Sequence, residues 1–111
     1  MEKYLVTGGA GFIGSNIVKK LLENGKSVRV TDNFSTGRKE NIKEFLSNPG
    51  FELIEGDLTD FDIAKKSVHG VDVVFHEAAL PSVLRSIEDP IKSNNANILA
   101  TLNMLVASRD L

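Results

Sequence analysis

The sequence has no cysteine and only two histidines among its 111 residues. Without cysteine there are no disulfides and no cysteine-ligated metals, and two histidines are a poor basis for a zinc site. No apolar run approaches the roughly 20 residues that a membrane-spanning helix requires. Lysine and arginine are spread along a chain of net charge −2, without the basic patch typical of proteins that bind nucleic acids or anionic membranes. We therefore expect no metal, nucleic-acid or membrane partner.

The first residues, MEKYLV, begin a strand at once and lack the layout of a signal peptide. An apolar content of 41% and a charged content of 25% are ordinary for a soluble globular protein. A chain of this length suffices for one small domain. These features predict a cytoplasmic protein with a single domain, residues 1–111.

Strand and helix signals alternate along the chain. Short apolar segments predict strands at 4–7, 27–32, 51–55 and 71–75. Helical spacing of apolar residues follows at 13–22, more weakly around 42–46, after 59, and from 90 to the end. Regular alternation with short connections indicates a parallel sheet with right-handed crossovers. We expect an α/β protein with a doubly wound sheet in the order 3-2-1-4.

Three of these helices carry specific signals. Ile42, Phe45 and Leu46 share one face of the weaker helix. Thr59 and Asp62 resemble a capping box for the third helix. The last helix begins with an Asp89–Pro90 pair, and its apolar face is marked by Ile91, Ile98, Leu102, Leu105 and Val106.

The stretch VTGGAGFIGSN, residues 6–16, connects the first strand to the first helix. Gly8, Gly11 and Gly14 are spaced G-x-x-G-x-x-G, which differs from the G-x-G-x-x-G dinucleotide fingerprint but supplies the same parts. The three glycines allow, in turn, a tight turn, close approach of a pyrophosphate, and close packing of helix on sheet. The helix N-terminus offers N–H groups to the anion. A glycine run alone also fits a loop that merely turns.

Asp32 ends the second strand, 18 residues after Gly14, close to the roughly 20 expected for the acidic residue that binds the adenosine ribose. Its carboxylate accepts hydrogen bonds from two ribose hydroxyls and repels a 2′-phosphate, which predicts NAD rather than NADP. Arg38 and Lys39 argue the other way, and we interpret them as the solvated start of the next helix. Asp57, after the third strand, either bonds the adenine amino group or caps the helix that follows.

Five stretches, VTGGAGFIGSN, DNFSTGRKEN, GDLTD, VFHEAALPSVLRSIEDP and NILATLNMLVASRD, together resemble the extended short-chain dehydrogenase/reductases. Within that family the likeness is to NAD-dependent nucleotide-sugar 4-epimerases of the UDP-glucose and UDP-N-acetylglucosamine type. It covers essentially all of the chain. Related dehydratases and decarboxylases share the single motifs, and ALPSVLRSIEDP is the part that points toward UDP-sugar epimerases. The resemblance implies a Rossmann-type fold, here truncated, with NAD as cofactor and a UDP-sugar as substrate.

The resemblance also implies a role for each matching residue. The pyrophosphate would be held by Gly8, Gly11, Phe12, Ile13 and Gly14. The adenosine ribose would be surrounded by Asp32, Asn33, Ser35 and Thr36, and adenine flanked by Asp57 and Leu58. The nicotinamide-side ribose would approach Ala78 and Ala79, beside Asn97 of the N-x-x-G-T pattern, in which Ala100 replaces glycine here. Sugar-nucleotide contacts would begin at Ser82 and Arg85.

Some of these polar residues also have ordinary structural explanations. Asn94, Asn97 and Thr101 fit a solvated flank of the last helix as well as a site beside the glycine loop. His76 fits a strand-end residue better than a base, because no carboxylate at a telling spacing orients it.

The family reaction, as the resemblance implies, transfers a hydride from the sugar C4 to NAD and returns it to the other face of the keto sugar. A tyrosine acts as acid/base, assisted by a lysine four residues later. The only tyrosine here is Tyr4, and Gly8 follows it four residues on, so Y-x-x-x-K is missing. We expect the N-terminal, cofactor-binding portion of an epimerase-like protein, inactive alone. A non-catalytic NAD-sensing or interaction module, or a structural fragment that binds nothing, are the alternatives.

Two surfaces predict a homodimer. The strand at 71–75 would form a sheet edge, is nearly all apolar, and has Asp72 as its only charge. Such edges recruit other strands through their unpaired backbone groups. The last helix has more leucines than one sheet face needs, namely Leu99, Leu102 and Leu105, with Val106. We favour pairing through the strand edge over pairing through the helix.

Overall fold

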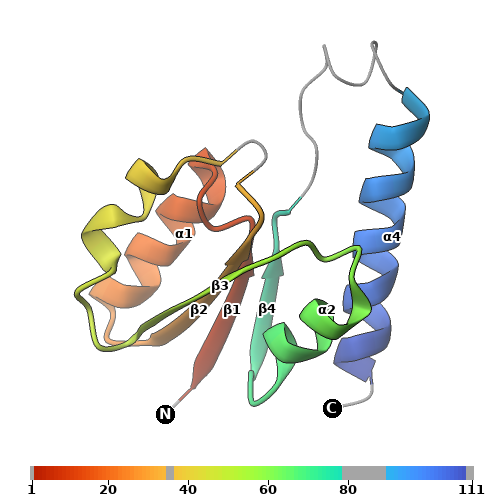
Figure 1. Ribbon diagram of the computed structural model, residues 1–111. Coiled ribbons are helices and arrows are strands. Elements are labelled where there is room, and N and C mark those ends of the chain that lie inside the picture. Colours follow the sequence, from red (N-terminus) through yellow and green to blue (C-terminus); the bar gives the residue numbers. More distant parts are fainter. Residues whose placement is uncertain (1, 35–36, 79–89, 110–111) are drawn as a thin grey trace.

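The computed structural model describes residues 2–34, 37–78 and 90–109, with side chains in the last helix described from Leu99 onward. Four parallel strands form one sheet in the order β3-β2-β1-β4. The strands are β1 (Lys3–Thr7), β2 (Ser27–Asp32), β3 (Phe51–Glu55) and β4 (Val73–His76) (Figure 1). The order and the parallel pairing confirm the predicted doubly wound arrangement.

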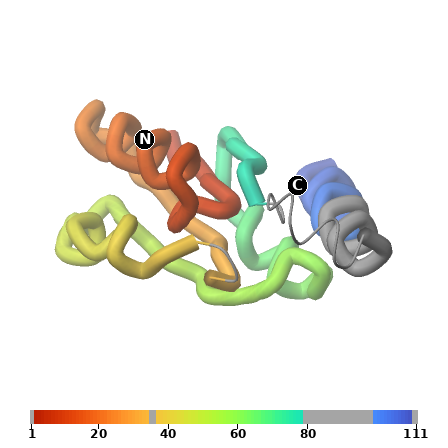
Figure 2. Tube along the Cα trace, turned by 90° about the horizontal axis from the view of Figure 1, so that it is seen from above, coloured from red at the N-terminus to blue at the C-terminus, as the bar shows by residue number. Residues whose placement is uncertain are grey.

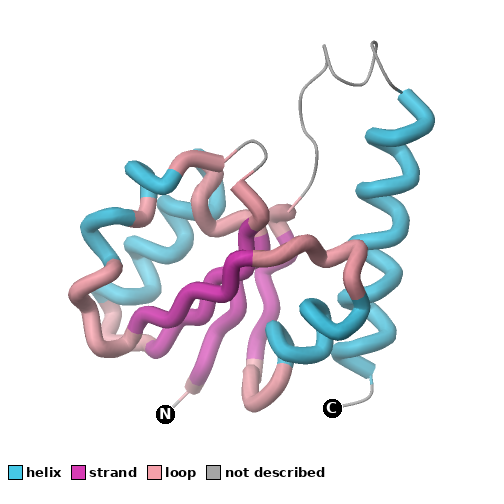
Figure 3. Tube along the Cα trace, in the orientation of Figure 1, coloured by secondary structure: helices cyan, strands magenta, loops and turns pink. Residues whose placement is uncertain are grey.

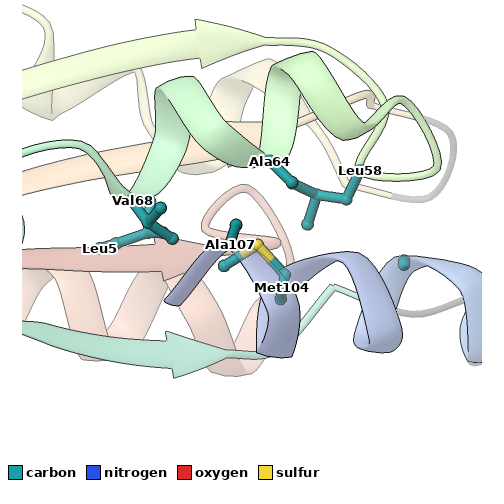
Figure 4. Packing of buried hydrophobic residues seen from close by; sticks show 7 residues of the cluster. Leu5, Leu58, Ala64, Val68, Met104 and Ala107 are labelled. Atoms are coloured by element: carbon teal, nitrogen blue, oxygen red, sulfur yellow. The ribbon is translucent and has the colours of Figure 1, made fainter. Parts of the chain in front are cut away.

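Helices cover both faces of this sheet (Figure 2). On one face, α1 (Phe12–Glu23) and two short 3-10 turns, η1 (Lys39–Asn41) and η2 (Lys43–Phe45), enclose a core of Val6, Val18, Val28, Val30 and Ile42. On the other face, α2 (Phe61–Val68) and α4 (Pro90–Arg109) enclose a second core of Leu5, Leu58, Ala64, Val68, Ala100, Met104 and Ala107 (Figure 4). The central strands β1 and β2 are buried on both faces along most of their length.

The segment predicted as a weak helix forms the two 3-10 turns instead. Ile42 and Phe45 are buried as expected, but Leu46 is 59% exposed. The backbone N–H of Phe45 donates to the carbonyl of Ile42, three residues earlier. Apolar residues three apart suit the 3-10 repeat, and nothing apolar continues the pattern into a longer helix.

The start of α2 also differs from the prediction. The N-cap is Asp60, whose carboxylate accepts from the backbone N–H of Asp62 at 2.9 Å. The Thr59 capping box is therefore wrong. The Asp57 carboxylate accepts from the backbone N–H of Thr59 at 2.9 Å, so it stabilises the turn before the helix and does not cap it.

Helix α4 begins at Pro90 as expected, whereas Asp89 lies outside the described residues. Its buried face is not the predicted one. Ala100, Met104 and Ala107 face the second core, while Leu102 and Leu105 are 52% and 65% exposed. The small alanine side chains let α4 approach α2 closely. None of the helices in the described part of the chain is long and apolar enough to span a membrane.

Candidate functional site

The carboxyl ends of β1, β2 and β4 lie at one edge of the sheet, where each strand continues into a loop (Figure 3). The backbone N–H of Gly8 donates to the carbonyl of Thr31 at 2.8 Å, and that of Glu77 donates to the carbonyl of Thr7 at 3.1 Å. These bonds fix the first residues of the loops after β1 and β4 against the ends of the neighbouring strands. In doubly wound sheets, ligands bind at this edge where the strand order reverses, here between β1 and β4.

Two of the predicted glycines are required by the packing of the chain itself. Gly8 has φ +68°, and a Cβ there would lie 2.8 Å from the backbone nitrogen of Ala78. A Cβ on Gly14 would overlap the carbonyl oxygen of Gly8. These positions exclude side chains because the β1 turn, the end of β4 and the start of α1 lie in direct contact.

Gly11 is different, because the chain barely restricts it. It is the N-cap of α1 with φ −78°, and the one atom near an added Cβ is the Gly8 carbonyl oxygen, at 3.3 Å. No side chain of the described residues caps this helix end. Phe12 and Ile13, the first helical residues, are 81% and 62% exposed. An uncapped helix N-terminus beside an open glycine can bind an anion.

The Asp32 carboxylate ties the end of β2 to the glycine loop. Its Oδ2 accepts from the backbone N–H of Ala10 at 3.0 Å, and its Oδ1 accepts from that of Phe34 at 2.7 Å. Asp32 is 8% exposed. A carboxylate has about four lone-pair sites, and the bonds within the described residues take up two of them.

The carbonyl oxygen of Ala10 is also hydrogen-bonded, through contacts that the sequence does not predict. The Ala10 carbonyl accepts from the backbone N–H of Arg38 at 3.1 Å and from the Asn41 side-chain amide at 2.8 Å. Together with Asp32, these groups bind both backbone polar atoms of Ala10, its N–H and its carbonyl oxygen. Asn41 lies inside the quoted stretch DNFSTGRKEN, but its spacing from the glycines carries no signal of this bond.

Lys39 agrees with its interpretation as a solvated residue. Its ammonium group lies 3.5 Å from the Glu55 carboxylate and 5.3 Å from the ring centre of Phe34, and its side chain is 71% exposed. These two contacts and this exposure are those of a solvated surface lysine.

The end of β4 forms the other side of the site. The backbone N–H of Ala78 donates to Thr7 Oγ1 at 3.1 Å, and Thr7 Oγ1 lies 2.7 Å from His76 Nδ1. Burial lowers the pKa of His76 below its ordinary value of 6.5, and the charge of Glu77 opposes this in part. Thr7 was not among the predicted site residues, because a buried threonine in a strand gives no functional signal.

Of the remaining predicted site residues, some are described by the structure and others are not. Asp57 and Asn33 are exposed near the ends of β3 and β2, whereas the Leu58 side chain lies in the second core. Five others, Ser35, Thr36, Ala79, Ser82 and Arg85, lie outside the described residues, and of Asn97 only its place in α4 is described.

Tyr4 lies away from the C-terminal ends of the strands, where the candidate site is. It lies in the first half of β1, and its hydroxyl donates to the Glu2 carboxylate at 3.0 Å. This hydrogen bond raises the pKa of Tyr4, which is the opposite of what a catalytic acid/base requires near neutral pH.

The sheet order, the helix N-terminus at the reversal point and the acidic residue ending β2 define the Rossmann class of dinucleotide-binding folds. Comparison with known proteins narrows this class. The model of the NAD dependent epimerase/dehydratase family matches residues 4–111, and the chain belongs to that family.

Individual relatives agree with this assignment. A Methanocaldococcus jannaschii protein, provisionally named UDP-glucose 4-epimerase, is 45% identical over 106 residues, which are 95% of this chain and 33% of the relative. The Arabidopsis thaliana UDP-glucuronic acid decarboxylase 1 is 44% identical over 103 residues, 93% of this chain and 22% of the relative. The Thermus thermophilus UDP-glucose 4-epimerase, solved in complex with NAD, superimposes with a TM-score of 0.84 at 41% identity, over 97% of this chain and 34% of that one. The chain thus spans between 22% and 34% of the length of these proteins.

Proposed function

We propose that this chain binds NAD at the C-terminal edge of its sheet, as the cofactor-binding part of a nucleotide-sugar epimerase of the UDP-glucose 4-epimerase kind. The relatives include both an epimerase and a decarboxylase of UDP-sugars by name. The stretch ALPSVLRSIEDP favours the epimerase, and Ser82 and Arg85 within it are the proposed first contacts to the sugar nucleotide.

The carboxylate of Asp32 is the observation that carries the proposal. It accepts hydrogen bonds from the backbone N–H groups of Ala10 and Phe34, which fix its position at the C-terminal end of β2. A ribose diol fits this acceptor, because each hydroxyl donates one hydrogen bond to a charged oxygen. A 2′-phosphate would place a second negative charge against it, which favours NAD over NADP.

The pyrophosphate would bind between the glycine turn and α1. Backbone N–H groups at the start of the helix and its positive dipole end attract the anion. The exposed side chains of Phe12 and Ile13 leave the terminus accessible. Gly11 leaves the space that a close backbone approach needs.

NAD, when bound, supplies the hydride acceptor and donor of the proposed reaction. The residues of this chain would bind and orient it, with the backbone of Ala78, which lies next to Gly8, on the nicotinamide side. Proton transfer at the sugar hydroxyl requires a separate acid/base, and the chain has no Y-x-x-x-K. We therefore expect no interconversion of UDP-sugar epimers by the purified 111-residue chain, and detectable turnover would contradict this assignment of roles.

Calorimetric titration with NAD and NADP tests the proposal. The wild-type chain should bind NAD more tightly than NADP. Replacing Asp32 with alanine should weaken NAD binding and reduce the preference by about 1–3 kcal/mol, the scale of hydrogen bonds to a charged group. The matched control is Asp62→Ala, which removes an exposed carboxylate of α2 and should leave both affinities unchanged. Unchanged selectivity in the Asp32 variant would overturn the proposed role of this residue.

We further propose that the chain forms a homodimer, through the free edge of β4 or the exposed leucines of α4. Both surfaces are present in the described residues, since β4 pairs with β1 on one side and Leu99 is 43% exposed. A cytoplasmic location stays a prediction from the sequence.

A further inference from the structure

A chain of hydrogen bonds joins β1, β4 and α4 at the C-terminal edge of the sheet. His76 Nδ1 lies 2.7 Å from Thr7 Oγ1, and His76 Nε2 lies 3.2 Å from Thr101 Oγ1. Thr7 Oγ1 also accepts from the backbone N–H of Ala78 at 3.1 Å. One imidazole thus connects three segments that are distant in the sequence.

The chemistry of these groups assigns the protons. A backbone N–H can only donate, so Thr7 Oγ1 is the acceptor for Ala78. Thr7 is fully buried, and within the described residues its hydroxyl hydrogen has one acceptor, His76 Nδ1. If Nδ1 accepts this hydrogen, it is unprotonated. The bonds then correspond to a neutral imidazole that carries its proton on Nε2, 3.2 Å from Thr101 Oγ1.

The same bonds position the backbone beside the first glycine. The space of a Gly8 side chain is filled by the nitrogen of Ala78 and the carbonyl oxygen of Glu77, each 2.8 Å from the place of the missing Cβ. The Thr7 hydroxyl holds that nitrogen, and His76 holds the hydroxyl in the orientation that accepts from it. We propose that His76 is a positioning residue of the NAD site, which as a neutral imidazole fixes the Ala78 backbone against Gly8 through Thr7.

This inference rests on the proposed function and gives His76 a role other than that of a base. Thr7 from β1 and Thr101 from α4, the groups that bond the ring, do not titrate. Glu77, next in the chain, is the charged group whose field raises the pKa of His76, against the larger lowering by burial. Protonation would turn Nδ1 into a donor and leave the Thr7 hydroxyl hydrogen without its acceptor.

The tautomer can be measured without any ligand. Long-range 1H–15N correlation spectra of the chain labelled at histidine should show His76 with its proton on Nε2 at neutral pH, and a His69→Gln variant assigns the two rings. A proton on Nδ1, or a charged ring at neutral pH, would overturn the inference.

Two substitutions then separate hydrogen bonding from packing. His76→Asn places an amide oxygen near the position of Nδ1, whereas His76→Leu fills a similar volume without an acceptor. In the leucine variant we expect faster hydrogen exchange of the Ala78 amide and roughly tenfold weaker NAD binding, with both restored to near wild type in the asparagine variant. Thermal unfolding checks that both variants fold.

The outcomes distinguish this inference from the function on which it rests. Equal effects in the two folded variants, or no effect in either, would overturn the positioning role while wild-type binding of NAD still supports the proposed function. If the wild-type chain does not bind NAD in the same titration, the proposed function fails, and the assignment of His76 to an NAD site fails with it.

Discussion

The Asp32 carboxylate and the backbone N–H of Ala10 lie 3.0 Å apart, although 22 residues separate them in the sequence. The end of β2 therefore fixes the turn that follows β1. The Asn41 side-chain amide donates to the carbonyl oxygen of the same residue, Ala10, at 2.8 Å. Asp32, the proposed ribose-binding residue, and the glycine turn, the proposed pyrophosphate site, are thus joined by hydrogen bonds. A substitution in one of them should therefore change the binding of NAD at the other as well.

The contact of Asn41 with Ala10 gives the first prediction. Asn41→Ala removes one neutral hydrogen bond from the glycine turn and should weaken NAD binding by about 0.5–1.5 kcal/mol, with little change in the preference over NADP. Calorimetric titration measures both quantities. Asn48→Ala is the matched control, because it also removes a side-chain bond to a backbone group, that of Gly50 at 2.8 Å, away from the C-terminal edge. Equal losses in the two variants would reject the role of Asn41.

The two kinds of glycine in the turn give the second prediction. Gly14→Ala should lower the free energy of unfolding severely, because its Cβ would overlap the carbonyl oxygen of Gly8. Gly11→Ala has no such overlap. The added Cβ would lie 3.3 Å from the Gly8 carbonyl oxygen, which would have to move only slightly. We expect this variant to fold with nearly wild-type stability and to bind NAD less tightly.

Chemical denaturation and NAD titration of both variants test this contrast. A Gly11→Ala protein that is stable and binds NAD with unchanged affinity would show that nothing approaches the backbone at this position. A Gly14→Ala protein of wild-type stability would contradict the packing explanation for the third glycine.

Much of the fold was predictable because its signals are local. Val28 and Val30 alternate along β2, and Gly25 marks the end of α1 with a positive φ of +74°. The order of the strands followed from the alternation of strands and helices. What failed were details that depend on tertiary contacts. The face of α4 is set by close packing of Ala100 against α2, and a pattern that seeks large apolar residues overlooks alanine.

The site was predictable where one residue type has one chemical use. Gly8 belongs to this class, since its positive φ restricts the residue strongly. Asp32 lies at the end of β2, where the sequence predicts an acidic residue, and its contact with a ribose stays a prediction. Thr7 and Asn41 do not belong to this class, because threonine in a strand and asparagine in a loop have many ordinary uses. Thr7 contacts His76, 69 positions away, and Asn41 contacts Ala10, 31 positions away. A local sequence pattern cannot predict contacts between residues so far apart in the chain.

Buried Arg29 gives the third prediction. Its guanidinium donates to the carbonyls of Lys66, Ser67 and His69 at the end of α2 and pairs with Glu52 at 3.1 Å. Arg29→Leu would leave the three carbonyls without their donor and should destabilise the chain by about 1–3 kcal/mol, the cost of buried acceptors left unsatisfied.

Urea denaturation measures the stability of this variant. Lys39→Ala, which removes an ion pair whose lysine side chain is 71% exposed, is the control and should cost less than about 1 kcal/mol. A loss in Arg29→Leu no larger than that of the control would contradict the anchoring of α2 by Arg29.

The pH dependence of stability is the fourth prediction. Burial holds the pKa of His76 below its ordinary 6.5, so the unfolded chain binds the proton more readily. The stability contributed by neutral His76 is therefore complete above pH 6.5 and is lost as the pH falls through the lowered pKa. The hydrogen bond from Lys3, with Arg29 assisting, holds the pKa of Glu52 below 4.5. Its contribution is complete above pH 4.5 and is lost at still lower pH.

Unfolding measured from pH 8 down to pH 3 should thus show two successive losses of stability. His76→Asn should remove the first, and Glu52→Gln should reduce the second. A wild-type stability that rises as the pH falls below 6.5 would show that His76 gains a proton on folding, which contradicts a neutral imidazole in the folded chain.

Self-association is the last prediction. Within the described residues β4 is paired with β1 alone, so its other side presents unpaired backbone groups, and Phe75 on this strand is 37% exposed. Sheet edges of this kind pair with another strand. The leucines of α4, with Leu105 65% exposed, offer a second surface. We favour the strand edge, because unmade backbone hydrogen bonds cost more than exposed leucines, and a symmetric pair would satisfy both edges at once.

Light scattering over a concentration series should show the mass of a dimer. Val73→Lys places a charge on the edge strand and should shift the chain to a monomer, whereas Leu105→Lys should not if the edge is the interface. The opposite pattern would assign the dimer to α4, since a lysine among the helix leucines opposes their burial. Circular dichroism verifies that each variant is folded before its mass is interpreted. A wild-type mass that stays monomeric at the highest concentration rejects both surfaces, because neither would then be buried by a second copy.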